Sequence, residues 1–275
     1  MTDVQTNQLS IDRSRPGIWT VSISNPPINM LNEETIDELR GLVQLLEQEE
    51  PLKVVVFESA DPDFFFAHYD TSRAGQSAGK AGPTGYHPWI DFVLRLSKAP
   101  VVSIAKVRGR ARGVGNEFLL ACDLRFASKE KAVFGQPEVG VGVIPGGGAI
   151  EWLPRLVGRS RALEIILSAD DLDADTAEAY GMINRAINDA GLDAYVEAFA
   201  LRIASFDKQT LGAAKGLLNR TGVPEGDEIA ASNRSFFESV TWPGAQARRA
   251  KVSQLGYGQR TEFELNFGKA LRRLG

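Results

Sequence analysis

Cysteine and histidine are almost absent from this sequence of 275 residues, which contains one cysteine, Cys122, and two histidines, His68 and His87. A single cysteine cannot form a disulfide within the chain, and these three side chains cannot build a thiolate zinc site. We therefore expect no metal. Acid–base chemistry would have to come mostly from carboxylates, hydroxyls and backbone groups, and we expect Cys122 to be a small, unreactive core residue.

An excess of basic charge and a long apolar run are also missing. The 31 Lys and Arg residues face 35 Asp and Glu residues, so the formal net charge is −4, which disfavours nucleic acid as a partner because phosphate binding needs a basic face. The longest apolar runs, such as residues 54–57, are far shorter than the roughly 18 residues that cross a bilayer. The polar start of the chain has no signal-peptide core. These absences predict a cytoplasmic protein with neither a membrane nor a nucleic-acid partner.

What is present is an alternation of strand and helix patterns. The helix after Asn32, a good N-cap, begins with Glu33 and Glu34, whose charges suit the positive end of a helix dipole. The alternation predicts an α/β fold built from ββα or βαβ steps. Residues 71–85 are small, polar and glycine-rich, which predicts a mobile surface segment. The strands are expected at residues 18–24, 53–57 and 101–105, and the helices at residues 33–46 and 86–96.

The last third of the chain has mainly helical patterns. This change of character predicts a core over residues 1–200 and a helical C-terminal region over residues 201–275. The helices are expected at residues 160–167, 174–179, 192–203, 208–218 and 225–237.

Glycine is concentrated between residues 109 and 148, which hold nine of the 27 glycines. Gly113 and Gly115 form a turn that leads into a helix, and such a turn directs free N–H groups at a ligand oxygen. Glu117 falls in the first turn of this helix, where its charge is also favourable for purely structural reasons. The pattern is neither a dinucleotide fingerprint nor a phosphate loop, because the third glycine and the Gly-Lys-Ser/Thr sequence are missing.

A second acid stands in an almost entirely apolar run. Glu138 lies between Pro137 and Gly140, and apolar surroundings would raise its pKa into the range of a useful acid or base. The alternative is a loop glutamate that faces water. Arg108, Arg110 and Arg112 alternate, which would place them on one side of an extended segment, facing phosphates, solvent or an interface.

Five motifs in order, between residues 25 and 187, resemble the crotonase family, also called the enoyl-CoA hydratase/isomerase family. They are similar to the family patterns NPPxNxL, AGxD, KPxIAAVxG, GGGxELxxxCD and FxxPE…PGxG. The matching segments are NPPINML (25–31), AHYD (67–70), KAPVVSIAKVRG (98–109), GVGNEFLLACD (113–123) and FGQPE with IPG (134–138 and 144–146).

The resemblance implies a spiral of ββα turns with a helical C-terminal region that builds homotrimers, often paired into hexamers. It implies an enzyme of acyl-CoA and fatty-acid metabolism that needs no cofactor, since coenzyme A is part of the substrate. By position, the N–H groups of Ala67 and Val114 would hold the thioester oxygen. Glu117 would activate water, and Glu138 would deliver a proton to the α-carbon. Retention of both glutamates is the hydratase pattern.

The chain departs from the family pattern beside the thioester site. Gly113 keeps the first glycine of its motif and Asp70 keeps the final residue of AGxD, but His68 and Tyr69 replace a glycine and a small residue. We expect these two side chains to narrow or polarise the acyl pocket. The C-terminal segment, which in the family often closes that pocket, also differs.

The leading hypothesis is an enoyl-CoA hydratase, a lyase that adds water across a 2,3-double bond. The alternatives with the same fold are a CoA-thioester isomerase, hydrolase or C–C lyase. An alternative of another class is a binding or scaffolding protein that turns over no acyl-CoA.

Overall fold

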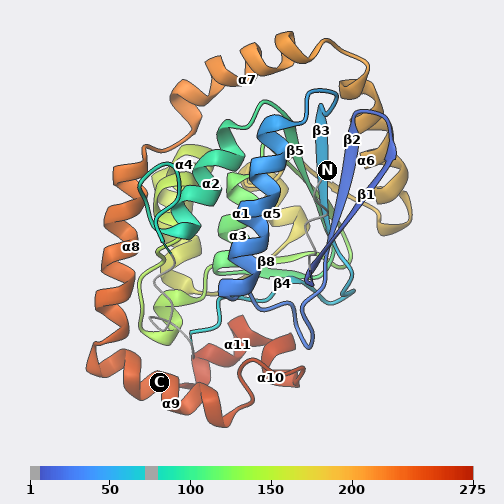
Figure 1. The fold of residues 1–275 in the computed structure, drawn as a ribbon. Helices are drawn as coiled ribbons and strands as arrows, with labels where there is room; N and C mark the ends of the chain where they lie inside the picture. The colour runs from blue at the N-terminus through green and yellow to red at the C-terminus, as the bar shows by residue number, and fades with distance from the viewer. Residues whose placement is uncertain (1–6, 72–79, 275) are drawn as a thin grey trace.

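Two sheets and the helices that cover them make up the molecule (Figure 1), and the computed structural model describes residues 7–71 and 80–274. Part of the segment expected to be mobile, residues 72–79, lies outside the described residues. The large sheet has the order β1 (Leu9–Arg15), β2 (Ile18–Ile23), β3 (Val54–Ser59), β5 (Val102–Val107), β7 (Leu124–Ser128), β10 (Arg185–Ile187). The small sheet has the order β4 (Phe64–Phe66), β6 (Arg110–Arg112), β8 (Val133–Gly135), β9 (Asp171–Asp173).

From β3 to α4, three successive turns of the chain each give one strand to each sheet and then a helix. Strands β2, β3, β5 and β7 are parallel in the large sheet, and β4, β6 and β8 are parallel in the small sheet. Gly109, with a φ of +72°, turns the chain from β5 to β6, and an added Cβ would lie 2.4 Å from the carbonyl carbon of Asp63. The α/β architecture of ββα turns predicted from the sequence is therefore confirmed.

Helices cover both faces of the large sheet because its central strands are apolar on both faces. Val55 and Phe57 of β3 pack towards α1 and α2, whereas Val54 and Val56 pack against α6. The helices are α1 (Glu33–Gln48), α2 (Pro88–Lys98), α3 (Val114–Ala121), α4 (Ala149–Ser168), α5 (Ala174–Tyr180), α6 (Asp189–Ala204), α7 (Lys208–Gly222), α8 (Gly226–Val240), α9 (Pro243–Gln254), α10 (Glu262–Leu265) and α11 (Phe267–Leu271). Short 3₁₀ helices are η1 (Glu138–Val141) and η2 (Arg272–Leu274).

The helix expected at residues 160–167 is the second half of α4. Gly158 has non-helical angles (φ 78°, ψ 159°) and kinks α4 there, and a helical first half from Ala149 was not predicted. The N-cap at Asn32 is confirmed, because its side chain accepts the backbone N–H of Thr35 at 2.9 Å. Every described element after residue 204 is helical.

The turn at Gly109 separates Arg108 from the other two alternating arginines, whereas Arg110 and Arg112 of β6 share a side and both donate to the Leu265 carbonyl. Arg108 forms ion pairs with Asp189 and Asp193 of α6. Arg112 is buried, and two of its nitrogens contact the carboxylate of Asp171 at 2.7 Å each. These arginines therefore hold elements together. Cys122 is buried as expected, directly after α3.

Candidate functional site

The first residues of α3 stand beside a small cavity. Gly113 has a φ of +53°, and this conformation directs the chain into the helix at Val114, which lines the cavity. The first N–H groups of a helix have no partner within the helix and carry its positive dipole end. Gly115 lets α3 lie directly on β4, since an added Cβ would be 2.4 Å from the Phe66 carbonyl oxygen. The backbone N–H of Val114 is thus well placed to bind an anionic oxygen.

The cavity has a volume of about 60 Å³ and a mostly apolar lining. Leu31 and Ile36 contribute from the segment around the start of α1, Trp89 from α2, and Phe236 and Phe237 from α8. Elements far apart in the sequence therefore enclose the cavity, and α8 is the last of them along the chain.

Glu117 projects from α3 into this cavity. Its side chain is buried, and Oε1 accepts the backbone N–H groups of Gly147 (2.8 Å) and Ala149 (3.1 Å). Burial raises the pKa of Glu117 to about 7, against the opposing effect of these two hydrogen bonds. Such a carboxylate can exchange a proton near neutral pH.

Glu138 begins η1 and lines the same cavity. Its Oε2 is buried without a hydrogen-bond partner among the described residues. Burial and then the negative charge of Glu117 raise the pKa of Glu138 well above its usual value. Glu138 is half-buried as a whole, and its side chain lines the cavity. Because two nearby carboxylates cannot both ionise easily, the pair tends to hold one proton.

Gly147 has no room for a side chain, because an added Cβ would lie 2.2 Å from Oε2 of Glu117. We expect Gly147→Ala to displace this carboxylate and to lower turnover on the order of 10²-fold, the loss typical of misplacing a reacting group by about 1 Å. Steady-state kinetics checks this. Gly216→Ala in α7, where an added Cβ meets nothing within 4 Å, is the matched control and should keep full activity. Wild-type turnover in Gly147→Ala would contradict the placement of Glu117.

The predicted role of Ala67 needs correction. Its backbone N–H donates to the carbonyl oxygen of Asn29 at 3.1 Å. Leu31 pairs with Tyr69 in a parallel bridge, in which Leu31 donates to the His68 carbonyl (2.9 Å) and accepts from the Asp70 N–H (2.9 Å). In such a bridge the N–H of the central residue points to the opposite edge. The N–H of Tyr69 therefore points away from Leu31, and Tyr69 also lines the cavity.

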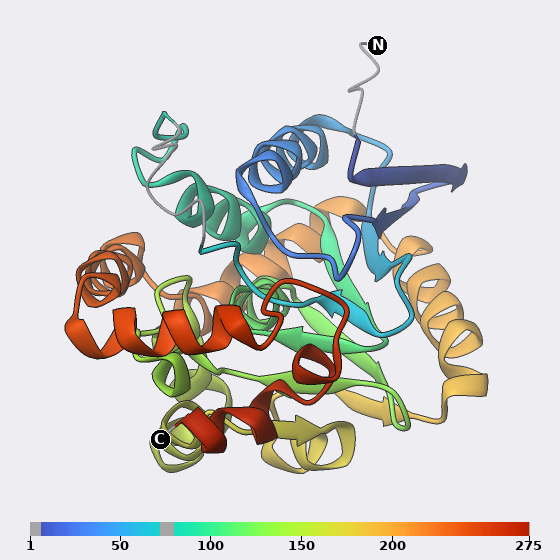
Figure 2. The ribbon, with the colours of Figure 1, turned by 90° about the horizontal axis from the view of Figure 1, so that it is seen from below.

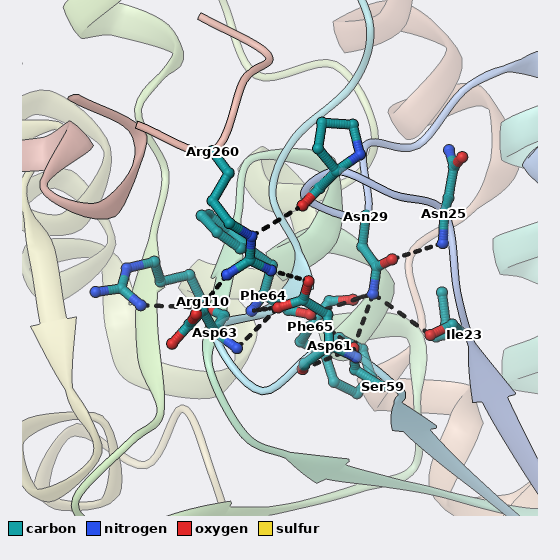
Figure 3. Close-up of polar contacts among 11 residues, drawn as sticks. Ile23, Asn25, Asn29, Ser59, Asp61, Asp63, Phe64, Phe65, Arg110 and Arg260 are labelled. Atoms are coloured by element: carbon teal, nitrogen blue, oxygen red, sulfur yellow. Dashed lines mark hydrogen bonds and ion pairs between the residues drawn. The ribbon is translucent and has the colours of Figure 1, made fainter. Parts of the chain in front are cut away.

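Asn29 holds this loop in place (Figure 3). It has a φ of +52° and is buried. Its Nδ2 donates to Ser59 Oγ (2.8 Å) and to the Phe64 carbonyl (3.2 Å), and its Oδ1 accepts the Asn25 N–H (2.6 Å). The NPPIN segment thus fixes the start of the cavity wall against β4.

The side chains of the AHYD segment diverge. Tyr69 lines the cavity, and its hydroxyl donates to Glu33 Oε1 at 2.7 Å. His68 instead points to the C-terminal segment, where Nε2 lies 2.9 Å from Glu264 Oε1. The expectation that His68 narrows the acyl pocket is therefore corrected. Asp70 lines a separate cavity of about 360 Å³, beside Arg249 of α9.

Sequence reasoning gave too little weight to His87, which lines the main cavity and packs on Phe237 with 5.7 Å between ring centres. Its Nδ1 accepts the Trp89 N–H at 3.4 Å as the N-cap of α2, and burial lowers its pKa. The sequence His87-Pro88 was an available signal that a helix begins there with His87 as its N-cap, because proline is favoured at the first position of a helix. Trp89 was predicted only as a helix residue, yet its Nε1 donates to the Gly147 carbonyl at 3.0 Å, next to the carboxylate of Glu117.

Within residues 7–71 and 80–274, no group of three or more His, Cys, Asp or Glu side chains is suited to hold a metal ion. No helix in these ranges is long and apolar enough to cross a bilayer.

Comparison with known proteins gives consistent matches. Residues 13–251 match the family model described as enoyl-CoA hydratase/isomerase. A short-chain-enoyl-CoA hydratase of Clostridium acetobutylicum is 32% identical over 74% of this chain and 78% of its own. A probable mitochondrial enoyl-CoA hydratase 2 of Arabidopsis thaliana is 34% identical over 66% of this chain, which spans only 60% of that relative. A Streptomyces avermitilis crystal structure, provisionally named an enoyl-CoA hydratase, is 41% identical with a TM-score of 0.91 over both whole chains.

Proposed function

This chain belongs to the enoyl-CoA hydratase/isomerase family and has the crotonase fold, and we propose that it adds water across the 2,3-double bond of a 2-enoyl-CoA thioester. The observation that carries the proposal is the pair of carboxylates, Glu117 and Glu138, on one small cavity beside the start of α3. Their raised pKa values suit acid–base chemistry near neutral pH.

The backbone N–H groups of Val114 and Tyr69 would hold the thioester oxygen. Attack at C3 sends electron density through the conjugated system onto that oxygen, and N–H donors aimed at it stabilise the enolate-like state. Val114 is favoured as a donor by its place at the start of α3. Tyr69 replaces Ala67 in this proposal because of the direction of its N–H in the bridge with Leu31.

The two glutamates would divide the proton transfers. Ionised Glu117 takes a proton from water while the hydroxyl oxygen bonds to C3. Protonated Glu138 then gives its proton to C2, and a proton returns from Glu117 to Glu138 before the next cycle. The sum is the addition of one water molecule, so no cofactor is required, and coenzyme A enters only as part of the substrate.

The mostly apolar lining of the cavity, which includes Leu31, Phe236 and Phe237, favours an apolar acyl group. For the oligomeric state we propose a homotrimer or a dimer of trimers. Its support is the exposed leucines of α4 and α7: Leu167 is 62% exposed, Leu217 65% and Leu218 73%, and such apolar surface is typical of association sites. The cytoplasmic location stays a prediction.

A panel of short enoyl-, 3-enoyl- and saturated acyl-CoA thioesters, followed by mass spectrometry, tests the proposed reaction. A hydratase gives a product that has gained one water. An isomerase gives a product of unchanged mass, a hydrolase releases free coenzyme A, and a C–C lyase shortens the acyl group. A scaffold leaves every thioester intact, and each of these four results would contradict hydration.

The pKa of Glu117 predicts a pH dependence. Hydration needs this carboxylate ionised, so kcat/KM is expected to fall as the pH drops below about 7, by up to about tenfold per pH unit. Glu138 must be protonated, so the rate also falls at high pH, where the pair loses its remaining proton. The two apparent pKa values of such a pH profile belong to the coupled carboxylates together, and not to either glutamate alone. Initial rates over a pH series check this, and a rate that stays constant down to pH ~5 would contradict it.

A further inference from the structure

In the view from below, the chain between α9 and α11 lies across the strands of the small sheet (Figure 2). It contacts β6 through the hydrogen bond from Arg110 to the Leu265 carbonyl, and the loop of Tyr69 through the hydrogen bond from the Tyr257 hydroxyl. His68 is the centre of this contact. Its ring stacks on Tyr257, with 4.2 Å between ring centres and 16° between planes, and it also packs against Phe267. His68 is 4% exposed and Glu264 is fully buried.

Glu264 joins two parts of this contact through one oxygen. Its Oε1 accepts the backbone N–H of Gly258 at 2.8 Å and lies 2.9 Å from Nε2 of His68. Burial would raise the pKa of Glu264, but the positive charge and hydrogen bond of His68 hold it below its usual value. The Tyr257 hydroxyl adds a longer hydrogen bond to the Tyr69 carbonyl, at 3.4 Å.

The same stretch of chain also contacts the strand that leads to the other donor. Arg112 donates Nη1 to the Glu264 carbonyl at 2.6 Å, while Asp171 fixes the rest of its guanidinium. Arg112 immediately precedes Gly113 and Val114. Residues 256–265 therefore contact both backbone segments that would hold the thioester oxygen.

We propose that His68 and Glu264 form a positioning pair that fastens residues 256–265 to the loop of Tyr69 and thereby sets the spacing between the N–H groups of Tyr69 and Val114. The inference rests on the proposed function. A histidine has replaced the glycine that the family usually has here, and its side chain reaches the C-terminal segment instead of the substrate cavity. Neither member of the pair touches the reacting atoms.

His68→Gly is the direct test. Two donors typically contribute about 10²–10³-fold each, so partial misplacement of one is expected to lower kcat for a 2-enoyl-CoA roughly 10- to 100-fold, with a change in KM below about threefold. Added imidazole, which can occupy the space left by the ring, should restore part of kcat. Glu264→Gln keeps a hydrogen-bonding side chain beside His68 but removes the negative charge, and it should lose less activity than His68→Gly.

Arg272→Gln is the matched control, because it breaks an exposed ion pair with Asp170 at the end of the same C-terminal region and should leave kcat unchanged. Amide hydrogen exchange, followed by mass spectrometry, needs no turnover and so separates this inference from the proposed reaction. His68→Gly and Glu264→Gln should both accelerate exchange in residues 64–71 and 256–265 together. Two results would overturn the proposal. The first is unchanged exchange in a folded His68→Gly protein. The second is an equal loss of kcat in His68→Gly, Glu264→Gln and Arg272→Gln, without rescue by imidazole. If His68→Gly does not fold, unchanged exchange in Glu264→Gln would overturn it.

Discussion

Replacement of Glu117 by Gln is expected to lower the hydration rate of a short 2-enoyl-CoA by roughly 10²–10⁴-fold, the usual contribution of a general base. Glutamine has nearly the same shape and can keep the hydrogen bonds from Gly147 and Ala149 through its carbonyl oxygen. It cannot take a proton from water. KM should therefore change much less than kcat, and steady-state kinetics with the spectrum of the conjugated thioester measures both.

Glu151→Gln is the matched control. Glu151 is also a buried glutamate, 7% exposed, and burial raises its pKa. Its carboxylate, however, bonds the Ser232 hydroxyl and does not line the cavity of Glu117. We expect its turnover to stay within about threefold of wild type, since no proton transfer is lost. Equal losses in the two variants would show that charge removal alone, and not the base, explains the effect.

Val114→Pro is expected to lower the rate by about 10²–10³-fold, because it deletes a single N–H donor. Val114 is the first residue of α3, a position where proline is well tolerated since its N–H is not used within the helix. The preceding residue is Gly113, whose φ of 53° and ψ of −125° are accessible to glycine before proline. Melting temperature and circular dichroism should therefore stay close to wild type while turnover falls.

Val114→Gly and Val114→Ala keep the N–H and change only the side chain. They should retain most of the activity, and the glycine variant restores the residue that the family pattern has at this position. If the proline and glycine variants lose activity equally, the valine side chain matters and the backbone donor does not.

Local patterns predicted the parts of the fold that local chemistry determines. The strand at residues 18–24, the capped start at Asn32 and the buried strand at residues 53–57 each depend on neighbouring residues, and each is present with small shifts at its ends. β1 and helices α9 to α11 were not predicted. β1 is mostly exposed along its length, and α9 has only two buried residues, so neither has a clear apolar period.

The candidate site was predictable where a motif carries the chemistry and not where distant segments meet. Glu117 and Glu138 received their catalytic roles from the family motifs in which they lie, because the residue pattern alone left a structural role for Glu117 and a solvent-facing Glu138 open. No sequence pattern near Phe236 and Phe237 indicated that they line the cavity, because only the tertiary fold brings α8 next to it. His68 was placed beside the correct loop but with the wrong contact, since its partner Glu264 lies 196 residues further along the chain.

The central claim is that Glu117 and Glu138 add water to a 2-enoyl thioester. Incubation of the wild-type chain with a short 2-enoyl-CoA in deuterated water enriched in heavy oxygen, followed by mass spectrometry of the product, tests it most directly. The account predicts a 3-hydroxyacyl-CoA with one heavy oxygen at C3 and one deuterium at C2. Recovery of the unlabelled enoyl thioester, or a labelled product without heavy oxygen at C3, would contradict it.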